Sequence, residues 1–280
     1  MKYKIIGDSS TDVTDEMRAK YGFELAPLSF TLDGIEYIDD DNLDLQDYLA
    51  KIDGSANTPK SACPSINDYM DLMKGDHDNT FVVTLSSELS GSYNSAMNAR
   101  EMFMEENPGK NVHVVDSRGA ASLQVLIALK LVELCESGLS YEEVVQAIEL
   151  FRDKSKVIFV LEKIDTLEKN GRLSRMKAKI VRALNLKLIL MATDEGTIDL
   201  FDKARGTKKA LKKLVVKMGV IRPLDKDTVV VIAHCNAEER AMEVKAMIEE
   251  QYTQCKEIIV VQTKGLSSTY ANVGGIIVAY

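Results

Sequence analysis

Apolar and polar residues along the first half of the chain form two kinds of segment that follow one another in turn. Short runs rich in β-branched residues, such as residues 3–7 and 80–85, are closed by turn-forming and helix-capping residues. The longer segments between these runs are typical of helices. This alternation indicates a mostly parallel sheet with helices on both faces. The predicted strands are 3–7, 80–85 and 112–115, and the predicted helices are 15–21, 43–52, 64–74, 91–106, 119–137 and 140–154.

The helix predicted over residues 119–137 is apolar nearly all round, with Leu, Val or Ile at most positions from 123 to 134. Such a helix must be covered by protein on most of its faces. Two interpretations stay open at this point. The segment is a central core helix, or part of it forms one wall of an apolar ligand cavity.

A second α/β unit is predicted to begin at residue 157. Asp194, Glu195 and Gly196 separate two β-rich runs and indicate a hairpin. We therefore expect two domains, residues 1–155 and residues 156–280. In the second, the predicted strands are 157–161, 186–192, 197–201, 228–233 and 257–262, the predicted helices are 163–170, 177–186, 207–220 and 237–252, and the chain ends on an apolar run, 274–280.

Composition narrows the class of function. The 280 residues carry 35 basic and 43 acidic side chains, a net charge of −8, and no Trp. Nucleic acids and anionic membranes attract basic faces, so we expect no nucleic-acid partner and at most transient membrane contact. The four cysteines form no CxxC pair, and the N-terminus has no signal-peptide core. These features predict a cytoplasmic protein with reduced thiols, and no coiled coil or exposed apolar stripe demands more than a monomer.

A serine-rich turn, residues 85–95 (LSSELSGSYNS), lies between a predicted strand and a predicted helix. Free backbone N–H groups at a helix start attract anions, serine hydroxyls add donors, and Gly91 allows a ligand to approach the backbone. The alternative is that Ser90 simply caps the helix. Residues 8–12 and 116–118 follow two other strands of the same sheet, so these loops are expected to form a polar rim with the turn. Residues 57–65 add a further hydroxyl-rich loop.

The motifs of several enzyme classes are absent. The sequence contains no GxxxxGK[ST] phosphate-binding loop and no GxSxG nucleophile turn, and its three histidines show no metal-ligand spacing. We therefore expect no catalytic residue, no metal and no cofactor.

Basic residues concentrate around one turn of the second half. Gly171 ends a predicted helix, and Arg172 follows it, at a place where an arginine can pair with a carboxylate or phosphate. This group is either a solvated helix face or a docking surface for an acidic or phosphate-carrying partner. The other basic residues of the group are Arg175, Lys177, Lys179, Arg182, Arg205, Lys208 and Lys209.

These motifs, taken in order, resemble the DegV family, the fatty-acid-binding subunits of the bacterial fatty acid kinase system. The resemblance extends from end to end and is carried by residues 8–12 (DSSTD), 59–65 (PKSACPS), 85–96, 115–117 (VDS) and 170–174 (NGRLS). It implies an α/β protein of two domains, the first with a parallel sheet and the second with a mixed sheet. It also implies a buried long-chain fatty acid that is presented to a kinase for acyl-phosphate formation, without catalysis by this chain.

The resemblance further implies roles for individual residues. Ser61, where the family usually has Thr, and Ser90 hold the carboxylate together with backbone N–H groups near Gly91. Arg172 is implied in phosphoryl transfer by the partner kinase, with Arg205 as a second basic contact.

One position departs from the family. Where the family usually has a Thr-His pair near its C-terminus, this chain has Thr269 and Tyr270. A tyrosine donates one neutral hydrogen bond to a carboxylate but does not become cationic near neutral pH. We expect ligand binding to survive this change, with Tyr270 as a fourth donor. The alternative function is a regulator that senses a lipid or a small anion. A third alternative is an independent phosphotransferase or acyl hydrolase, but the sequence shows no general base beside Ser90 for such an enzyme.

Overall fold

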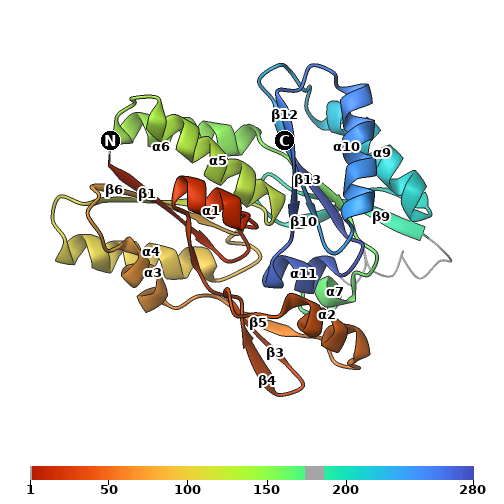
Figure 1. Cartoon of the computed structure of the whole chain (residues 1–280), viewed down its shortest axis with the longest axis horizontal. Helices are drawn as coiled ribbons and strands as arrows, with labels where there is room; N and C mark the ends of the chain where they lie inside the picture. The colour runs from red at the N-terminus through yellow and green to blue at the C-terminus, as the bar shows by residue number, and fades with distance from the viewer. Residues whose placement is uncertain (1, 174–185) are drawn as a thin grey trace.

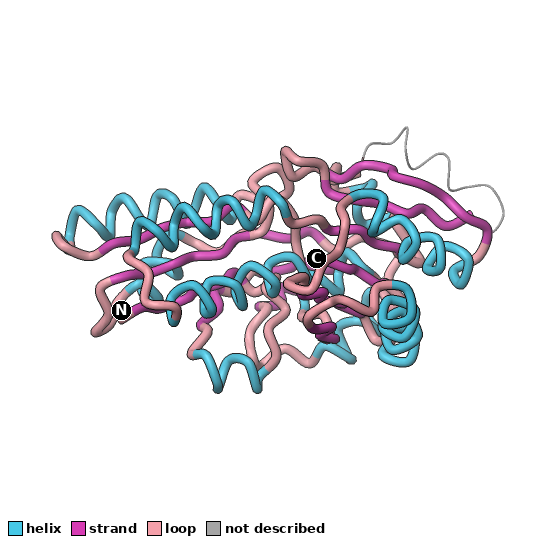
Figure 2. The backbone as a smooth tube through the Cα atoms, turned by 90° about the horizontal axis from the view of Figure 1, so that it is seen from above, coloured by secondary structure: helices cyan, strands magenta, loops and turns pink. Residues whose placement is uncertain are grey.

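The computed structural model describes residues 2–173 and 186–280. Two sheets lie side by side along the long axis of the molecule, and helices cover their faces (Figures 1 and 2). The helix predicted over 177–186 lies almost entirely outside the described residues, as do Arg175, Lys177, Lys179 and Arg182. No helix within the described residues is long and apolar enough to cross a membrane.

The first sheet is parallel throughout, as the alternating pattern predicts. Its order is β2-β1-β6-β7, and each strand pairs in parallel with its neighbours. Helices α3 and α4 pack on one face and α5 and α6 on the other. The strands are β1 (Tyr3–Asp8), β2 (Glu24–Ala26), β6 (Asn79–Thr84) and β7 (Asn111–Asp116), and the helices are α1 (Asp15–Tyr21), α3 (Ile66–Met73), α4 (Ser92–Glu106), α5 (Ser122–Glu136) and α6 (Tyr141–Lys154).

The second sheet has six strands in the order β10-β9-β8-β13-β11-β12 and is mixed, because only β11 and β12 run parallel. Helices α9 and α10 cover its outer face. The strands are β8 (Val157–Val160), β9 (Leu186–Ala192), β10 (Ile198–Arg205), β11 (Val229–His234), β12 (Glu257–Gln262) and β13 (Ile276–Ala279), and the helices are α7 (Asp165–Lys169), α9 (Thr207–Ile221), α10 (Glu238–Gln251) and α11 (Gly265–Ala271).

Helix α5 joins the two halves. It packs against β1 and β6 of the first sheet and against β11 and β13 of the second. Because both sheets cover it, every residue from Ser122 to Ala128 is buried, which explains a helix that is apolar on nearly all sides. The residues just before it, Gly119 to Ala121, line a cavity. The helix is therefore a central core helix, and the start of the predicted segment borders a cavity.

A third, small sheet escaped the sequence pattern. Strands β3 (Ser29–Leu32), β4 (Ile35–Ile38) and β5 (Lys60–Ala62) pair in the order β4-β3-β5, beside helix α2 (Leu45–Gly54), at the junction of the two larger sheets (Figure 1). Each strand is only three or four residues long. In β4 the side chains are mostly exposed, so no alternation of buried and exposed positions marks it.

Candidate ligand-binding site

A cavity lies between the two sheets and contains about 810 Å³ of atom-free space, part of it open to solvent. Its lining is mostly apolar and comes from strands β8, β9, β10 and β13 of the second sheet, from β5, α7 and α11, and from loops that include those after the strands of the first sheet. The apolar lining residues are Leu28, Leu85, Leu89, Ala120, Ala121, Val157, Phe159, Leu161, Leu167, Ala192, Ile198, Leu266, Ala271 and Ile277, and the side chains with polar groups are Ser10, Ser61, Ser90, Arg172, Ser267 and Tyr270.

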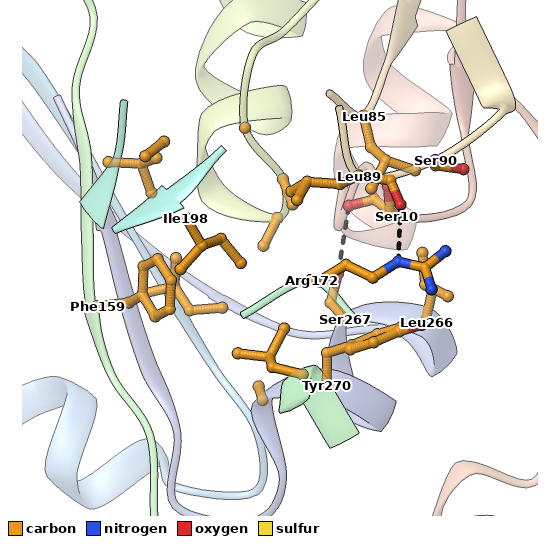
Figure 3. Close-up of a pocket in the computed structure, with 18 of the residues that line it drawn as sticks. Ser10, Leu85, Leu89, Ser90, Phe159, Arg172, Ile198, Leu266, Ser267 and Tyr270 are labelled. Carbon is orange, nitrogen blue, oxygen red and sulfur yellow. Dashed lines mark hydrogen bonds between the residues drawn. The ribbon is translucent and has the colours of Figure 1, made fainter. Parts of the chain in front are cut away.

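The polar groups are gathered toward one side of this cavity. Figure 3 shows Ser90, Arg172 and Tyr270 on one side and Phe159 and Ile198 on the opposite side. An amphipathic ligand fits such a lining best, because its apolar part leaves water while its polar head keeps hydrogen-bond partners.

Ser61 and Tyr270 are brought together across 209 positions of sequence. The Ser61 Oγ atom lies 3.0 Å from Tyr270 Oη, and either hydroxyl can be the donor. Asn170 Nδ2 donates to Tyr270 Oη at 3.5 Å and to the Pro59 carbonyl at 2.9 Å. Since Asn170 supplies a proton to the tyrosine oxygen, the tyrosine proton is free to point at Ser61 or at a ligand oxygen.

The serine-rich turn divides its hydroxyls between structure and cavity. Ser86 Oγ donates to the Gly196 carbonyl at 2.8 Å, Ser87 Oγ to Asp116 at 2.6 Å and Ser92 Oγ to Asp8 at 2.5 Å. Ser90 lines the cavity, and its Oγ also accepts from the Ser92 N–H at 3.2 Å. The N-cap residue of α4 is Gly91 and not Ser90, so the interpretation of Ser90 as a simple helix cap is wrong.

Two predicted site residues lie away from this cavity. Gly91 is exposed at the start of α4, where a Cβ atom would meet Cys63 Sγ at 3.2 Å, and it is not a lining residue. Arg205 is exposed at the end of β10 and does not line the cavity either. A contact between the backbone near Gly91 and the head group stays a prediction.

Arg172 borders the polar side of the cavity. Its Nε atom donates to the Leu89 carbonyl at 3.0 Å, and its Nη1 atom donates to the Asn170 carbonyl. These neutral acceptors fix the guanidinium without cancelling its charge, and no carboxylate of the described residues forms an ion pair with it. A fixed, uncompensated cation at the edge of an apolar cavity favours an anionic head group.

On the C-terminal side of the site, sequence reasoning named Tyr270 but missed Ser267. Ser267 lines the cavity from α11, and its Oγ donates to the Ser10 carbonyl at 3.4 Å. Ser10 belongs to the polar loop 8–12, and its hydroxyl lies 2.7 Å from Asp8 Oδ1 and 2.6 Å from Gln124 Oε1. Loop 8–12 was a recognisable signal, but the sequence of α11, GLSSTYA, has no helical pattern that could have revealed Ser267.

Two buried aspartates hold α11 in place. Asp39 accepts from the N–H groups of Gly265 and Leu266, both at 2.9 Å, and Asp12 accepts from the Lys264 N–H at 2.7 Å. Burial raises the pKa of Asp39 to about 6 and that of Asp12 to about 8, although these hydrogen bonds act in the opposite direction. Their role is to position the helix that carries four residues of the lining. Within the described residues no group of three or more His, Cys, Asp or Glu is arranged to hold a metal ion.

Fold and site together define a class of protein. It is an α/β protein whose two sheets lie on either side of an apolar cavity with polar groups on one side. The chain belongs to the DegV family, whose model matches residues 2–280. A DegV domain-containing protein of Streptococcus pneumoniae is 36% identical over 285 residues, which cover 100% of this chain and 99% of the relative.

Two solved structures extend the comparison to three dimensions. A DegV family protein of Ruminococcus gnavus, refined with vaccenic acid, has a TM-score of 0.95 and 42% sequence identity, with 99% of each chain covered. The fatty acid kinase (Fak) B3 protein of Streptococcus pneumoniae, loaded with linoleic acid, has a TM-score of 0.92 and 35% identity, covering 100% of this chain and 99% of its own. The similarity therefore extends over both sheets.

Proposed function

We propose that this chain binds a long-chain fatty acid in the cavity between its sheets. The observation that carries this proposal is the lining, which is apolar except for hydroxyls and one arginine gathered on one side. The similar proteins that were crystallised with vaccenic and linoleic acid support it. Burial of the acyl tail contributes about 0.8 kcal/mol per CH₂ group, so a long chain supplies most of the binding free energy.

The carboxylate is proposed to lie between Ser61, Ser90 and Tyr270, with Arg172 nearby. A carboxylate removed from water stays charged only where hydrogen bonds and opposite charge replace its hydration. The Ser61–Tyr270 pair offers two hydroxyls 3.0 Å apart, close enough to donate to one carboxylate. The uncompensated charge of Arg172 favours the ionised form of the ligand.

We further propose that the chain is not itself an enzyme and that it presents the bound acid to a kinase. Within the described residues, no histidine or carboxylate forms a hydrogen bond with Ser90 that would make its hydroxyl a nucleophile. Arg205, exposed at the end of β10, is then a contact for the kinase rather than for the ligand. We also propose that the protein is a monomer, that it is located in the cytoplasm and that its thiols are reduced. The boundary between its two domains is proposed to lie between residues 155 and 156.

Removal of the head-group hydroxyls is expected to weaken binding without unfolding the protein. Ser61→Ala and Tyr270→Phe each remove a hydrogen bond to a charged group, which contributes about 1.5–3 kcal/mol, or roughly 10- to 100-fold in affinity. Native mass spectrometry of delipidated protein with added oleate measures this loss, and Tyr93→Phe, a half-buried tyrosine that does not line the cavity, is the control. Wild-type protein that neither carries nor takes up a fatty acid would refute the proposed function.

The kinase role predicts a separation of binding from transfer. With a catalytic kinase subunit, ATP and bound oleate, Arg205→Gln is expected to lower acyl-phosphate formation several-fold while oleate affinity is unchanged. Lys226→Gln is the control, because Lys226 is an exposed cation just before β11, which is not a neighbour of β10 in the sheet. This variant should change neither acyl-phosphate formation nor oleate affinity. Tyr270→His is expected to raise acyl-phosphate formation, because a histidine can become cationic beside the carboxylate. Equal rates for wild type, Arg205→Gln and Tyr270→His would contradict the proposed presentation to a kinase.

A further inference from the structure

The apolar end of the cavity is closed by a β-hairpin. Ala192 and Ile198 face each other across the β9–β10 ladder, and both line the cavity. Val157 of β8 and Gly119, which adjoin each other, also line the cavity. Figure 3 shows Ile198 on the side opposite Ser90 and Arg172. The turn of the hairpin, residues 193–197, comes immediately beyond these residues.

Three contacts attach this turn to residues outside the hairpin. Ser86 Oγ donates to the Gly196 carbonyl at 2.8 Å, and Arg118 Nη1 donates to the Asp194 carbonyl at 3.2 Å. Lys156 Nζ lies 2.6 Å from Asp194 Oδ1. Because Ser86 and Arg118 belong to the loops of the first sheet, the turn of the second sheet rests directly on the first.

Gly196 allows this close seating. It is buried although it belongs to a turn, and its φ of +94° is one that side chains rarely adopt. A Cβ atom here would lie 2.3 Å from Ser86 Oγ and 3.0 Å from Arg118 Cα. Any other residue must therefore displace the Ser86 side chain, and the close approach to the Arg118 backbone favours movement of the turn away from the first sheet.

Behind the end of the cavity lies a second, polar pocket with about 340 Å³ of atom-free space. Its lining includes Arg118, Arg152 and Lys156, and it shares Val157 and Ala192 with the apolar cavity. The side chains of Val157 and Ala192 thus separate the apolar cavity from the polar pocket. Displacement of the turn would join the two compartments and let the cavity extend.

We propose that the 193–197 turn, with Ala192 and Ile198, is the end wall that sets the longest acyl chain this protein encloses. This inference rests on the proposed function. Each methylene that is buried rather than left in water changes affinity about fourfold. Affinity should therefore rise about fourfold per carbon until the methyl end reaches Ala192 and Ile198, and then stop rising.

Gly196→Ala tests the end wall, with Gly109→Ala as a matched control. Both glycines have a φ of +94°, but a Cβ at Gly109 meets nothing within 4 Å, so the control carries the same backbone strain without the clash. Competition of straight-chain saturated acids of increasing length, read by native mass spectrometry, gives the preferred length. Gly196→Ala should shift the preference to longer chains, and Gly109→Ala should leave it unchanged.

Ile198→Ala and Ala192→Leu test the same wall without backbone strain. The first should lengthen the preferred chain and the second should shorten it, by about fourfold in relative affinity for each carbon gained or lost. A wild-type protein that binds fatty acids, together with variants that keep its length preference, would overturn the end-wall proposal alone. A wild-type protein that binds none of the acids would overturn the proposed function itself.

Discussion

Replacement of Ile277 by tryptophan is expected to abolish fatty acid binding while the fold is retained. Ile277 lies on the central strand β13, yet it is only half-buried, whereas Ile276 and Val278 are completely buried. The difference arises because Ile277 borders the cavity. A larger side chain at this position occupies the space proposed for the acyl tail. It therefore avoids overpacking of the core, which would cost about 1–3 kcal/mol.

The measurement is a pair of experiments on the Ile277→Trp protein, a thermal melt and an oleate titration. We expect a melting temperature close to that of the delipidated wild type and an affinity lower by at least about 100-fold. Ile259→Trp is the matched control, since Ile259 is a half-buried isoleucine of the same sheet that does not line this cavity. An Ile277→Trp protein that binds oleate like the wild type would place the ligand elsewhere.

The second large effect concerns pH. The raised pKa values of Asp12, about 8, and Asp39, about 6, mean that the folded state holds these protons more tightly than the unfolded chain does. The contribution of these two carboxyl groups to stability is therefore greatest below the ordinary pKa of an aspartate, and it falls as pH rises toward 6 for Asp39 and toward 8 for Asp12. The slope is about 1.4 kcal/mol per pH unit for each carboxyl in its window.

Asp12→Asn is expected to remove the fall between pH 6.5 and pH 8, because an amide does not ionise. Burial lowers the pKa of His77 and His234, which gives an opposite slope below about pH 6.5, so the difference between wild type and variant is the informative quantity. Urea unfolding at pH 5 to 8 measures it. Asp227→Asn, at an exposed site, should follow the wild-type curve. A wild-type stability that is constant from pH 6.5 to 8 would show that Asp12 is already ionised.

Local pattern was sufficient for the large elements. The apolar runs around Ile5 and Val82 predict two strands of a parallel sheet, and the structure pairs them directly, with Ile6 beside Val82. The all-round apolar helix α5 predicts a buried position because no exposed helix carries such a surface. These features depend on residues close in sequence, and so the sequence alone reveals them.

Long-range contacts explain what the pattern did not predict. Helix α11 consists mostly of residues with low helix propensity, and it is stabilised by Asp39, more than 220 positions away, which accepts hydrogen bonds from its first N–H groups. Likewise β5 is a strand because Ser61 pairs with Phe30. Spacing alone gave no reason to place Ser61 beside Tyr270, and only the family resemblance named both residues.

The most direct test is carbon-13 NMR of oleate labelled at its carboxyl carbon and bound to the delipidated protein. We expect one bound resonance, at the position of an ionised carboxylate, that shifts in Ser61→Ala and Tyr270→Phe. Ser137→Ala, at an exposed serine after α5, should leave it in place. The absence of a bound resonance, or one that is the same in all four proteins, would contradict a fatty acid held by its carboxylate at Ser61 and Tyr270.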